Sequence, residues 1–143
     1  MISGPTVVDA SVVVEYLIEL QLAAHATRFF AGLVSGEGDL QLWAPDLIFA
    51  EATSALRKLV RRRAITEREG GQAVQRLARL PIIATGTAGL LPAVWRLRST
   101  ITAYDACYVA LAARLGAPMV TADARLGRAR AAGTAKIIFL GDL

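Results

Sequence analysis

Short apolar runs alternate with longer amphipathic segments along the whole chain of 143 residues. Runs that are brief, rich in β-branched or other apolar residues and bounded by turn residues predict strands. On this basis we expect strands at Thr6–Ala10, Gln41–Ala44, Ile82–Thr85, Met119–Thr121 and Lys136–Leu140.

The segments between these runs carry the spacing and the terminal residues that are typical of helices. We expect helices at Ser11–Leu20, Leu22–Val34, Asp46–Arg63, from Thr66 onward, Gly89–Ser99, Ala103–Leu115 and Arg125–Ala132. Asp46 has the side chain of an N-cap, and Thr66 with Glu69 matches a capping box. Gly116 and Pro118 are suited to end the helix that precedes them.

Strands that alternate with helices predict an α/β fold, a three-layer α/β/α arrangement around a central, mainly parallel sheet. The chain length and the hydrophobic fraction of 55% fit a single domain spanning residues 1–143, since domains commonly have about 100 to 150 residues. In such sheets the ligand crevice lies beyond the carboxyl ends of the strands. Asp9 and Asp123 occupy two of those ends.

Four acidic residues interrupt apolar segments, which is an unfavourable position for a charge. They are Asp9 after Thr6–Val8, Glu51 after Leu47–Ala50, Asp105 within Ala103–Val109, and Asp123 after Met119–Ala122. A carboxylate in apolar surroundings loses hydration, and neighbouring carboxylates repel one another. A Mg2+ or Mn2+ ion would relieve both effects, because hard cations prefer oxygen ligands. We therefore expect the four acids to converge and to hold a metal.

Each acid also has an interpretation that needs no metal. Asp9 and Asp123 are suited to cap helices, and the segment Thr102–Asp105 matches a capping box that would only support a helix start. Glu51 would pair with an arginine such as Arg57. Apolar residues flank all four acids, whereas a cap at an exposed helix end requires no such burial, and this favours a shared site.

The chain is basic, with a net charge of +4 and a pI near 9.8. Arginine supplies nearly all of the positive charge, and its guanidinium matches phosphate bidentately, which favours a nucleic-acid partner. A GC-rich genome would also favour arginine codons. The run Arg57–Arg63 is the clearest basic patch, followed by Arg125, Arg128 and Arg130. Such a run either follows RNA phosphates or forms the solvated face of a helix.

The remaining chemistry-bearing residues exclude some classes of protein. Cys107 is the only cysteine, so an internal disulfide is impossible, and a reducing compartment is natural. The longest uncharged stretch, Leu80–Trp95, is too short for a membrane span of about 20 residues, and we expect a soluble, cytoplasmic protein with no membrane partner. His25 is the only histidine, which excludes a ribonuclease with a histidine acid–base pair. Trp43 and Trp95 are expected to pack, although an exposed tryptophan could stack on a base.

The four acidic segments resemble, in order and spacing, the motifs of PIN-domain proteins. The matching segments are Val7–Leu17, Pro45–Arg57, Tyr104–Ala112 and Val120–Leu126. The resemblance covers nearly the whole chain, and its length is similar to that of the VapC toxin branch of the family.

This resemblance implies a Mg2+- or Mn2+-dependent endoribonuclease that hydrolyses a phosphodiester bond of tRNA or rRNA. Carried over by motif, the acidic site comprises Asp9, Glu51, Asp105 and Asp123. Asp9 and Asp105 resemble direct metal ligands, and the other two would bind through water or hold a second ion. Ser11 and Thr121 lie beside the acids, where they would hydrogen-bond a carboxylate or serve as an ordinary cap and strand residue.

The resemblance also implies partners. A VapB-type antitoxin would neutralise the toxin, with a basic segment that enters the acidic site. The apolar helices at Val12–Leu20 and Leu22–Val34 would offer it a groove. A homodimer is implied in the same way.

Two other classes compete with this interpretation. A phosphatase of the haloacid-dehalogenase type would use Asp9 as a nucleophile, but it needs a second aspartate where this chain has Ser11. A PIN-like module that binds RNA or protein without catalysis is the other alternative, and the presence of all four acids gives no reason to prefer it.

Overall fold

The fold is described here from a computed structural model, for residues 2–129 and 135–143. Parallel strands form one five-stranded sheet in the order β3-β2-β1-β4-β5. The strands are β1 (Pro5–Val8), β2 (Gln41–Pro45), β3 (Ile82–Thr85), β4 (Met119–Thr121) and β5 (Ile137–Phe139). All four pairings between neighbouring strands are parallel, as the alternation of strands and helices predicts.

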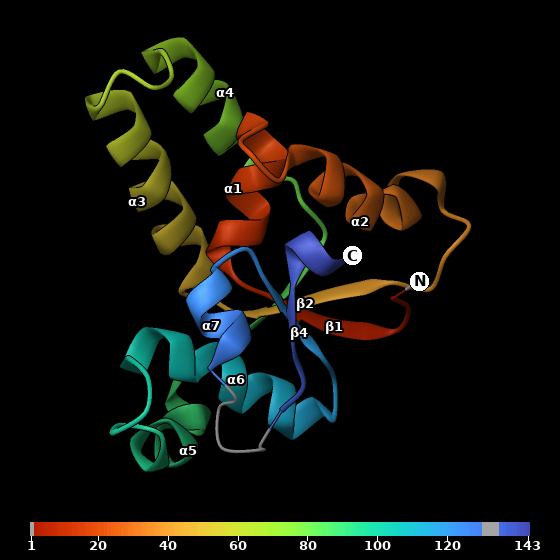
Figure 1. Cartoon of the computed structure of the whole chain (residues 1–143), viewed down its shortest axis with the longest axis vertical. Helices are drawn as coiled ribbons and strands as arrows, with labels where there is room; N and C mark the ends of the chain where they lie inside the picture. The colour runs from red at the N-terminus through yellow and green to blue at the C-terminus, as the bar shows by residue number, and fades with distance from the viewer. Residues whose placement is uncertain (1, 130–134) are drawn as a thin grey trace.

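Helices cover the sheet on both faces, which confirms the three-layer α/β/α prediction (Figure 1). On the upper side of Figure 1 lie α1 (Ala10–Ile18), α2 (Ala23–Ser35), α3 (Ile48–Arg61) and α4 (Glu67–Leu77). On the lower side lie α5 (Leu91–Arg96) and α6 (Ala103–Leu115), of which α6 packs on β1, β2 and β4. The short helix α7 (Ala124–Arg128) packs on β4 and β5. Two single 3-10 turns, Ala88–Leu90 and Leu140–Asp142, complete the elements.

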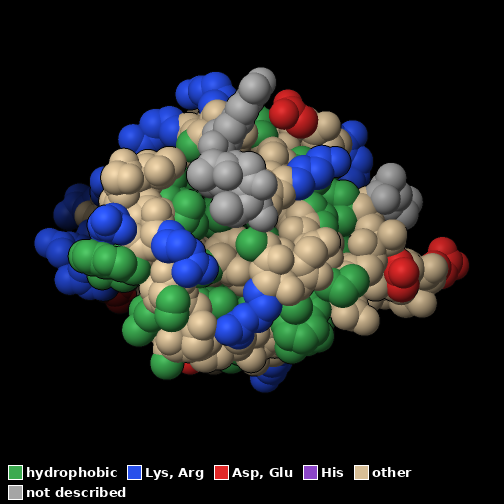
Figure 2. Space-filling model, turned by 90° about the horizontal axis from the view of Figure 1, so that it is seen from below, with side chains coloured by type: hydrophobic (Ala, Val, Ile, Leu, Met, Phe, Trp, Pro, Cys, Tyr) green, Lys and Arg blue, Asp and Glu red, His purple; other side chains and the backbone are tan. Residues whose placement is uncertain are grey.

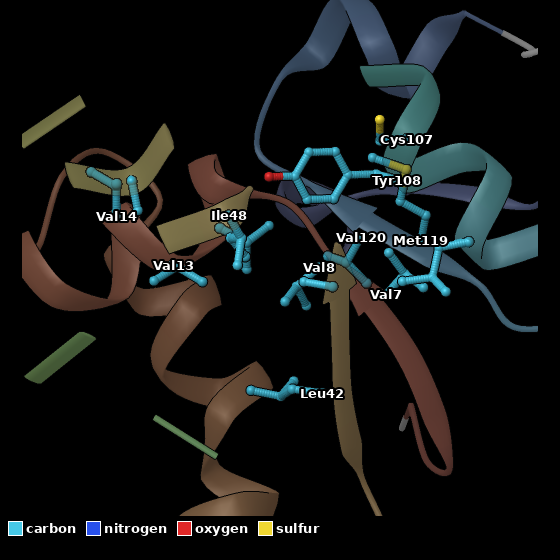
Figure 3. Packing of buried hydrophobic residues seen from close by; sticks show 14 of the residues in the cluster. Val7, Val8, Val13, Val14, Leu42, Ile48, Cys107, Tyr108, Met119 and Val120 are labelled. Carbon is cyan, nitrogen blue, oxygen red and sulfur yellow. The ribbon is translucent and has the colours of Figure 1, made fainter. Parts of the chain in front are cut away.

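The two central strands, β1 and β4, are apolar on both faces because helices cover both. Val7, Val8, Met119 and Val120 have no exposed surface. Figure 3 shows these side chains packed together, with the ring of Tyr108 from α6 beside them. Burial removes this apolar surface from water and stabilises the sheet by about 25 cal/mol per Å2.

The strand order reverses between β1 and β4, and this reversal determines where the site lies. From β1 the chain winds outward through β2 to β3, and it then crosses to β4 and continues outward to β5. The connections that follow β1 and β4 therefore leave on opposite faces of the sheet and open a crevice at the carboxyl ends. Asp9 follows β1 directly, and Asp123 begins α7 just after β4.

Two predicted helices begin or divide differently in the structure. Asp46 is not a side-chain cap: α3 begins at Ile48, after a residue that makes no side-chain cap hydrogen bond. Pro45 still pairs with Thr85 in the sheet, and the Asp46 backbone N–H donates to the carbonyl of Thr85, so the chain leaves the strand later than the sequence predicts. The expected helix at 89–99 is divided into a 3-10 turn and the six-residue α5, which ends at Arg96.

The helix predicted at 125–132 is observed as α7, which ends at Arg128. Residues 130–134 lie outside the described part of the chain, and with them Arg130 of the second predicted basic patch.

Candidate active site

Asp9 is the most enclosed of the four acids. Its backbone N–H donates to the carbonyl of Val120, which holds the start of α1 against β4. Its side chain caps α1 and retains only 6% exposure. Oδ1 accepts hydrogen bonds from the backbone N–H groups of Ser11 (3.1 Å) and Val12 (3.3 Å). Both the N-cap interpretation and the expected burial of this acid are therefore correct.

Two hydroxyl groups complete the surroundings of Asp9, as the sequence suggested for Ser11 and Thr121. Ser11 Oγ donates to Asp9 Oδ1 and Thr121 Oγ1 donates to Oδ2, each at 2.5 Å. The same hydroxyl oxygens accept from the loop after β4: Ala122 N–H donates to Ser11 Oγ (2.9 Å) and Asp123 N–H to Thr121 Oγ1 (3.0 Å). One hydrogen-bond network therefore joins the ends of β1 and β4 and fixes Asp9 and Asp123 relative to each other.

Burial raises the pKa of Asp9 to about 6, although the hydrogen bonds from Ser11, Thr121 and Val12 lower it. The charge of Asp105 raises it further. The ionised form of Asp9 is therefore costly near neutral pH, and a cation beside it would offset this cost.

Glu51 lies in the first turn of α3 and reaches across the carboxyl edge of the sheet. Tyr108 of α6 donates its hydroxyl proton to Glu51 Oε1 at 2.6 Å. Tyr108 itself is buried, and Figure 3 shows Ile48 on the side toward which its hydroxyl points. Burial raises the pKa of Glu51, the Tyr108 hydrogen bond lowers it, and Asp105 raises it. Among the described residues no ion pair joins Glu51 to Arg57, so that interpretation is wrong.

Asp105 is the electrostatic neighbour of the other three acids. The charge of Asp105 raises the pKa of both Asp9 and Glu51, and the charge of Asp123 raises the pKa of Asp105. Burial is the largest cause of the raised pKa of Asp105, and a side-chain hydrogen bond with Thr102 lowers it. The fold thus brings together four acids from four distant segments, as the sequence predicts.

Asp123 differs from the others because it also has a local role. Its side chain caps α7 by accepting from the backbone N–H of Arg125 at 2.9 Å, and the Arg125 Nε lies 3.8 Å from it. The expected deep burial applies to Asp9 alone, since Glu51, Asp105 and Asp123 are half-buried. Water or a ligand can therefore reach part of each of these three side chains.

The donor chemistry of this cluster suits a hard divalent cation, because carboxylate oxygens are the ligands that Mg2+ and Mn2+ prefer. Among the residues that the structure describes, only Thr121 donates to Asp9 Oδ2, and a carboxylate oxygen has two lone pairs, so this oxygen retains acceptor capacity. In the arrangement described for residues 2–129 and 135–143, no three acid, histidine or cysteine side chains surround one point closely enough to hold an ion as they stand. Side-chain rotation would be needed to close such a shell.

A pocket of about 490 Å3 opens beside Asp105 and Asp123. Its walls are the loop Arg98–Thr102 before α6 and, on the other side, Arg125, Leu126 and Ala129. Two acids and two arginines therefore border one solvent-accessible space, which is a suitable place for a phosphate diester beside a cation.

Sequence reasoning missed Tyr108 and Arg98 and misjudged Trp95. Tyr108 sits three residues after Asp105, and this spacing on one helix face is the signal that could have revealed it. Trp95 was expected to pack, but it is 67% exposed.

The basic run 57–63 occupies the distal half of α3 and the turn after it. Because a helix rises 1.5 Å per residue, Arg61 lies roughly 15 Å along α3 from Glu51.

The single cysteine and the single histidine lie apart from the acids' own hydrogen bonds. Cys107 is buried in the core, and the His25 Nδ1 lies 2.8 Å from the carbonyl oxygen of Leu143, far in sequence from the acids. Among the helices described, none has the length and apolar character that crossing a membrane would require.

Comparison with known proteins identifies relatives along nearly the whole chain. Residues 6–132 match the model of the PIN domain. Ribonuclease VapC12 of Mycobacterium tuberculosis is 33% identical over 122 residues, which cover 85% of this chain and 89% of that protein. Ribonuclease VapC9 of the same organism is 40% identical over 86 residues, or 60% of this chain and 68% of that protein.

Solved structures share the fold. VapBC2 from Rickettsia felis, bound to a DNA fragment from its promoter, aligns with a TM-score of 0.63 at 12% identity, over 94% of this chain and 98% of the other. The protein PAE2754 from Pyrobaculum aerophilum aligns with a TM-score of 0.65 at 18% identity, over 99% and 94%. At these identities the likeness concerns the fold alone. The family model and the VapC relatives carry the assignment, and they show that the chain belongs to the PIN-domain family.

Proposed function

We propose that this protein is a metal-dependent endoribonuclease and that it acts as the toxin of a VapBC-type toxin–antitoxin pair. The observation that carries the proposal is that Thr121 donates to Asp9 and accepts from Asp123 at the strand-order reversal, where Asp123 and Asp105 line one pocket. Relatives named VapC ribonucleases support the same activity.

The proposed reaction is hydrolysis of an RNA phosphodiester without a protein nucleophile. Asp9 is a poor nucleophile because its carboxylate accepts four hydrogen bonds and is enclosed. The aspartate-based phosphatase is disfavoured for the same reason, and Ser11 occupies the place of its second aspartate as a donor to Asp9. The acids instead position a cation and the reacting phosphate.

Mg2+ or Mn2+ is the cofactor that this donor set would hold. Asp9 and Asp105 would be direct ligands, with Glu51 and Asp123 acting through water or at a second ion. When bound, such an ion lowers the pKa of water and offsets the charge that develops on the phosphate. Ser11 and Thr121 hold the Asp9 carboxylate in one orientation, and Tyr108 does the same for Glu51. Arg125 and Arg98, at the pocket walls, would hold phosphate oxygens of the RNA.

The partners follow from this function. A cognate VapB-type antitoxin would neutralise the enzyme, a homodimer would be its working form, and tRNA or rRNA in the cytoplasm would be its substrate. The solved VapBC2 assembly from Rickettsia felis, which shares this fold, is an example of such a toxin–antitoxin complex.

The test is RNA cleavage by purified protein, with the metal removed and then restored. We expect Mn2+ or Mg2+ to support cleavage of tRNA or rRNA, EDTA to abolish it, and Asp9→Asn to be inactive at every metal concentration. Asp39→Asn is the matched control, because Asp39 is an exposed acid near the amino ends of the strands, where it accepts from Gly4 N–H. Equal cleavage in EDTA would refute the metal mechanism.

Induced expression in cells tests the toxin role. We expect the unmodified protein to arrest growth and Asp105→Asn to leave growth unaffected.

A further inference from the structure

An exposed tryptophan and an arginine form a stacked pair at the rim of the acidic pocket. The guanidinium carbon of Arg98 lies 4.7 Å from the centre of the Trp95 ring. Arg98 Nη1 also donates to the backbone carbonyl of Trp95 at 2.9 Å, which fixes the guanidinium over α5. Trp95 is 67% exposed despite this contact, so a large aromatic surface with a cation beside it remains open to solvent.

The same arginine belongs to the pocket that holds two of the acids. Arg98 and Arg125 both line this pocket, together with Asp105 and Asp123. The stacked pair therefore extends the pocket from the acids outward to the surface of α5. Figure 2, which views this end of the molecule from below, shows Lys and Arg side chains spread over the surface and acidic side chains only near its margins.

The fold does not need this arrangement for stability. An indole buried in the core would contribute far more through removal of apolar surface than one left in water. An aromatic ring with a neighbouring guanidinium is instead the platform on which unpaired bases stack. Phosphate groups on either side of such a base carry the negative charge that arginines at the pocket wall would hold.

We propose that Trp95 and Arg98 bind an unpaired nucleotide of the RNA substrate. The base stacks on the Trp95 indole, while Arg98 and Arg125 hold the phosphate that leads into the acidic pocket. This inference rests on the proposed ribonuclease function and adds a requirement: the RNA next to the cleaved bond is single-stranded or looped, because a paired base has no free face to stack.

Leu91, one turn before Trp95 on α5, is also exposed, and a protein partner would use both side chains as an apolar contact. The surroundings favour RNA, because the guanidinium that stacks on Trp95 also lines a pocket with a second arginine and two acids. If Trp95 is covered by a protein and not by RNA, the fluorescence titration will show it.

The chain has only two tryptophans, so Trp43→Phe leaves Trp95 as the sole fluorescent reporter. Asp9→Asn is added to prevent cleavage during titration. An unpaired RNA oligonucleotide should quench the Trp95 emission, and a duplex of the same sequence should quench it much less. In the Asp9→Asn background, Trp95→Leu should weaken binding of the unpaired RNA by about 5- to 100-fold, measured by anisotropy of a labelled strand. Trp95→Phe should restore most of this affinity.

Arg98→Gln should also weaken binding and should lower the slope of log affinity against log salt by about 1. Arg79→Gln is the charge-matched control, since Arg79 is exposed after α4 and is not part of the pocket. In the active protein, Trp95→Leu should raise KM for unpaired RNA and leave kcat nearly unchanged. Circular dichroism and the melting temperature would confirm that each variant is folded.

The inference is overturned if Trp95→Leu binds unpaired RNA as tightly as its parent, or if duplex and unpaired RNA quench Trp95 equally. It is also overturned if only a protein partner changes the Trp95 emission. These failures are distinct from failure of the proposed function. If the proposed function is wrong, the unmodified protein will cleave no RNA with Mn2+. If only the inference about Trp95 is wrong, the protein will cleave RNA, and Trp95→Leu will not alter KM.

Discussion

Tyr108 donates a hydrogen bond of 2.6 Å to Glu51, and this bond joins helices on opposite faces of the sheet at its carboxyl edge. Glu51 is carried by α3 and Tyr108 by α6, which also carries Asp105 one turn earlier. The Tyr108 hydroxyl therefore links the Glu51 carboxylate to the helix that carries Asp105. Tyr108 is a positioning residue, because it acts through Glu51 and need not touch the substrate.

Tyr108→Phe removes that hydroxyl and keeps the packing of the ring. We expect cleavage to fall by roughly 10- to 100-fold, as is typical when a residue that orients a metal ligand is lost, with a change in stability of about 1 kcal/mol. Glu51→Gln should cost more, and the double variant should be no worse than Glu51→Gln alone. Additive losses in the double-mutant cycle would show that Tyr108 acts independently of Glu51.

The raised pKa of Asp9 predicts how stability depends on pH when no metal is present. The folded-state pKa is about 6 and the reference value is 3.8, so the folded state binds more protons between these values. Stability therefore falls as pH rises through this window, by up to about 3 kcal/mol from this group. Glu51 and Asp105, whose pKa values are also raised, contribute with the same sign.

Urea denaturation in EDTA at pH 4 to 8 measures this effect, with Asp9→Asn as the reference. We expect the variant to become more stable than the unmodified protein above pH 6, and the difference to vanish near pH 4. A difference that is constant across the pH range would contradict the assignment of the raised pKa to Asp9.

Thr121 and Thr6 form a matched pair of buried threonines on adjacent strands. Thr121 donates to Asp9 and accepts from Asp123, whereas the Thr6 hydroxyl bonds only the carbonyl of Gly4, at 3.3 Å. Thr121→Val should destabilise the protein by about 1 to 3 kcal/mol, because it leaves buried polar groups unpaired, and should weaken Mn2+ binding. Thr6→Val should leave Mn2+ binding unchanged. Equal effects on metal affinity would mean that Thr121 does not support Asp9.

Two adjacent glycines in α4 should respond to alanine in opposite ways. A Cβ on Gly70 would lie 2.8 Å from the Val60 Cγ2 atom, whereas one on Gly71 meets no atom within 4 Å. Gly70→Ala should destabilise the protein by about 1 to 3 kcal/mol through overpacking. Gly71→Ala should stabilise it by about 0.5 to 1 kcal/mol, since alanine is the better helix former. Thermal denaturation would separate the two, and a stabilised Gly70→Ala would show that α3 and α4 pack less closely.

The sequence predicted the order of elements well because their signals are local. Parallel strands such as Val7–Val8 and Met119–Thr121 are buried on both faces and read as continuous apolar runs. The crevice was predicted from the carboxyl ends of parallel strands, and the convergence of the acids from those strand ends and the family resemblance, whereas the strand order came only from the structure. The beginning of α3 was missed because Pro45 is held in the sheet by β3, and this long-range pairing leaves no mark beside Asp46.

The details of the site depend on contacts that no local pattern encodes. Tyr108 hydrogen-bonds Glu51, which lies 57 positions away in the sequence, and Thr121 hydrogen-bonds Asp9, which lies 112 positions away. Exposure of Trp95 is equally nonlocal, because it depends on α5 being short and on which of its faces packs on α6. Residue types were therefore sufficient to identify the acids, whereas the hydroxyl groups that hydrogen-bond them became apparent only in the fold.

Counting bound Mn2+ tests whether these acids together hold a divalent cation. Electron paramagnetic resonance of free Mn2+ would give the stoichiometry for the unmodified protein, for Asp9→Asn, for Asp105→Asn and for the control Glu37→Gln, an exposed acid in the loop before β2. We expect at least one ion per chain for the unmodified protein and the control, with strong loss in both aspartate variants. Unchanged binding in Asp9→Asn and Asp105→Asn, or no binding by the unmodified protein, would contradict it.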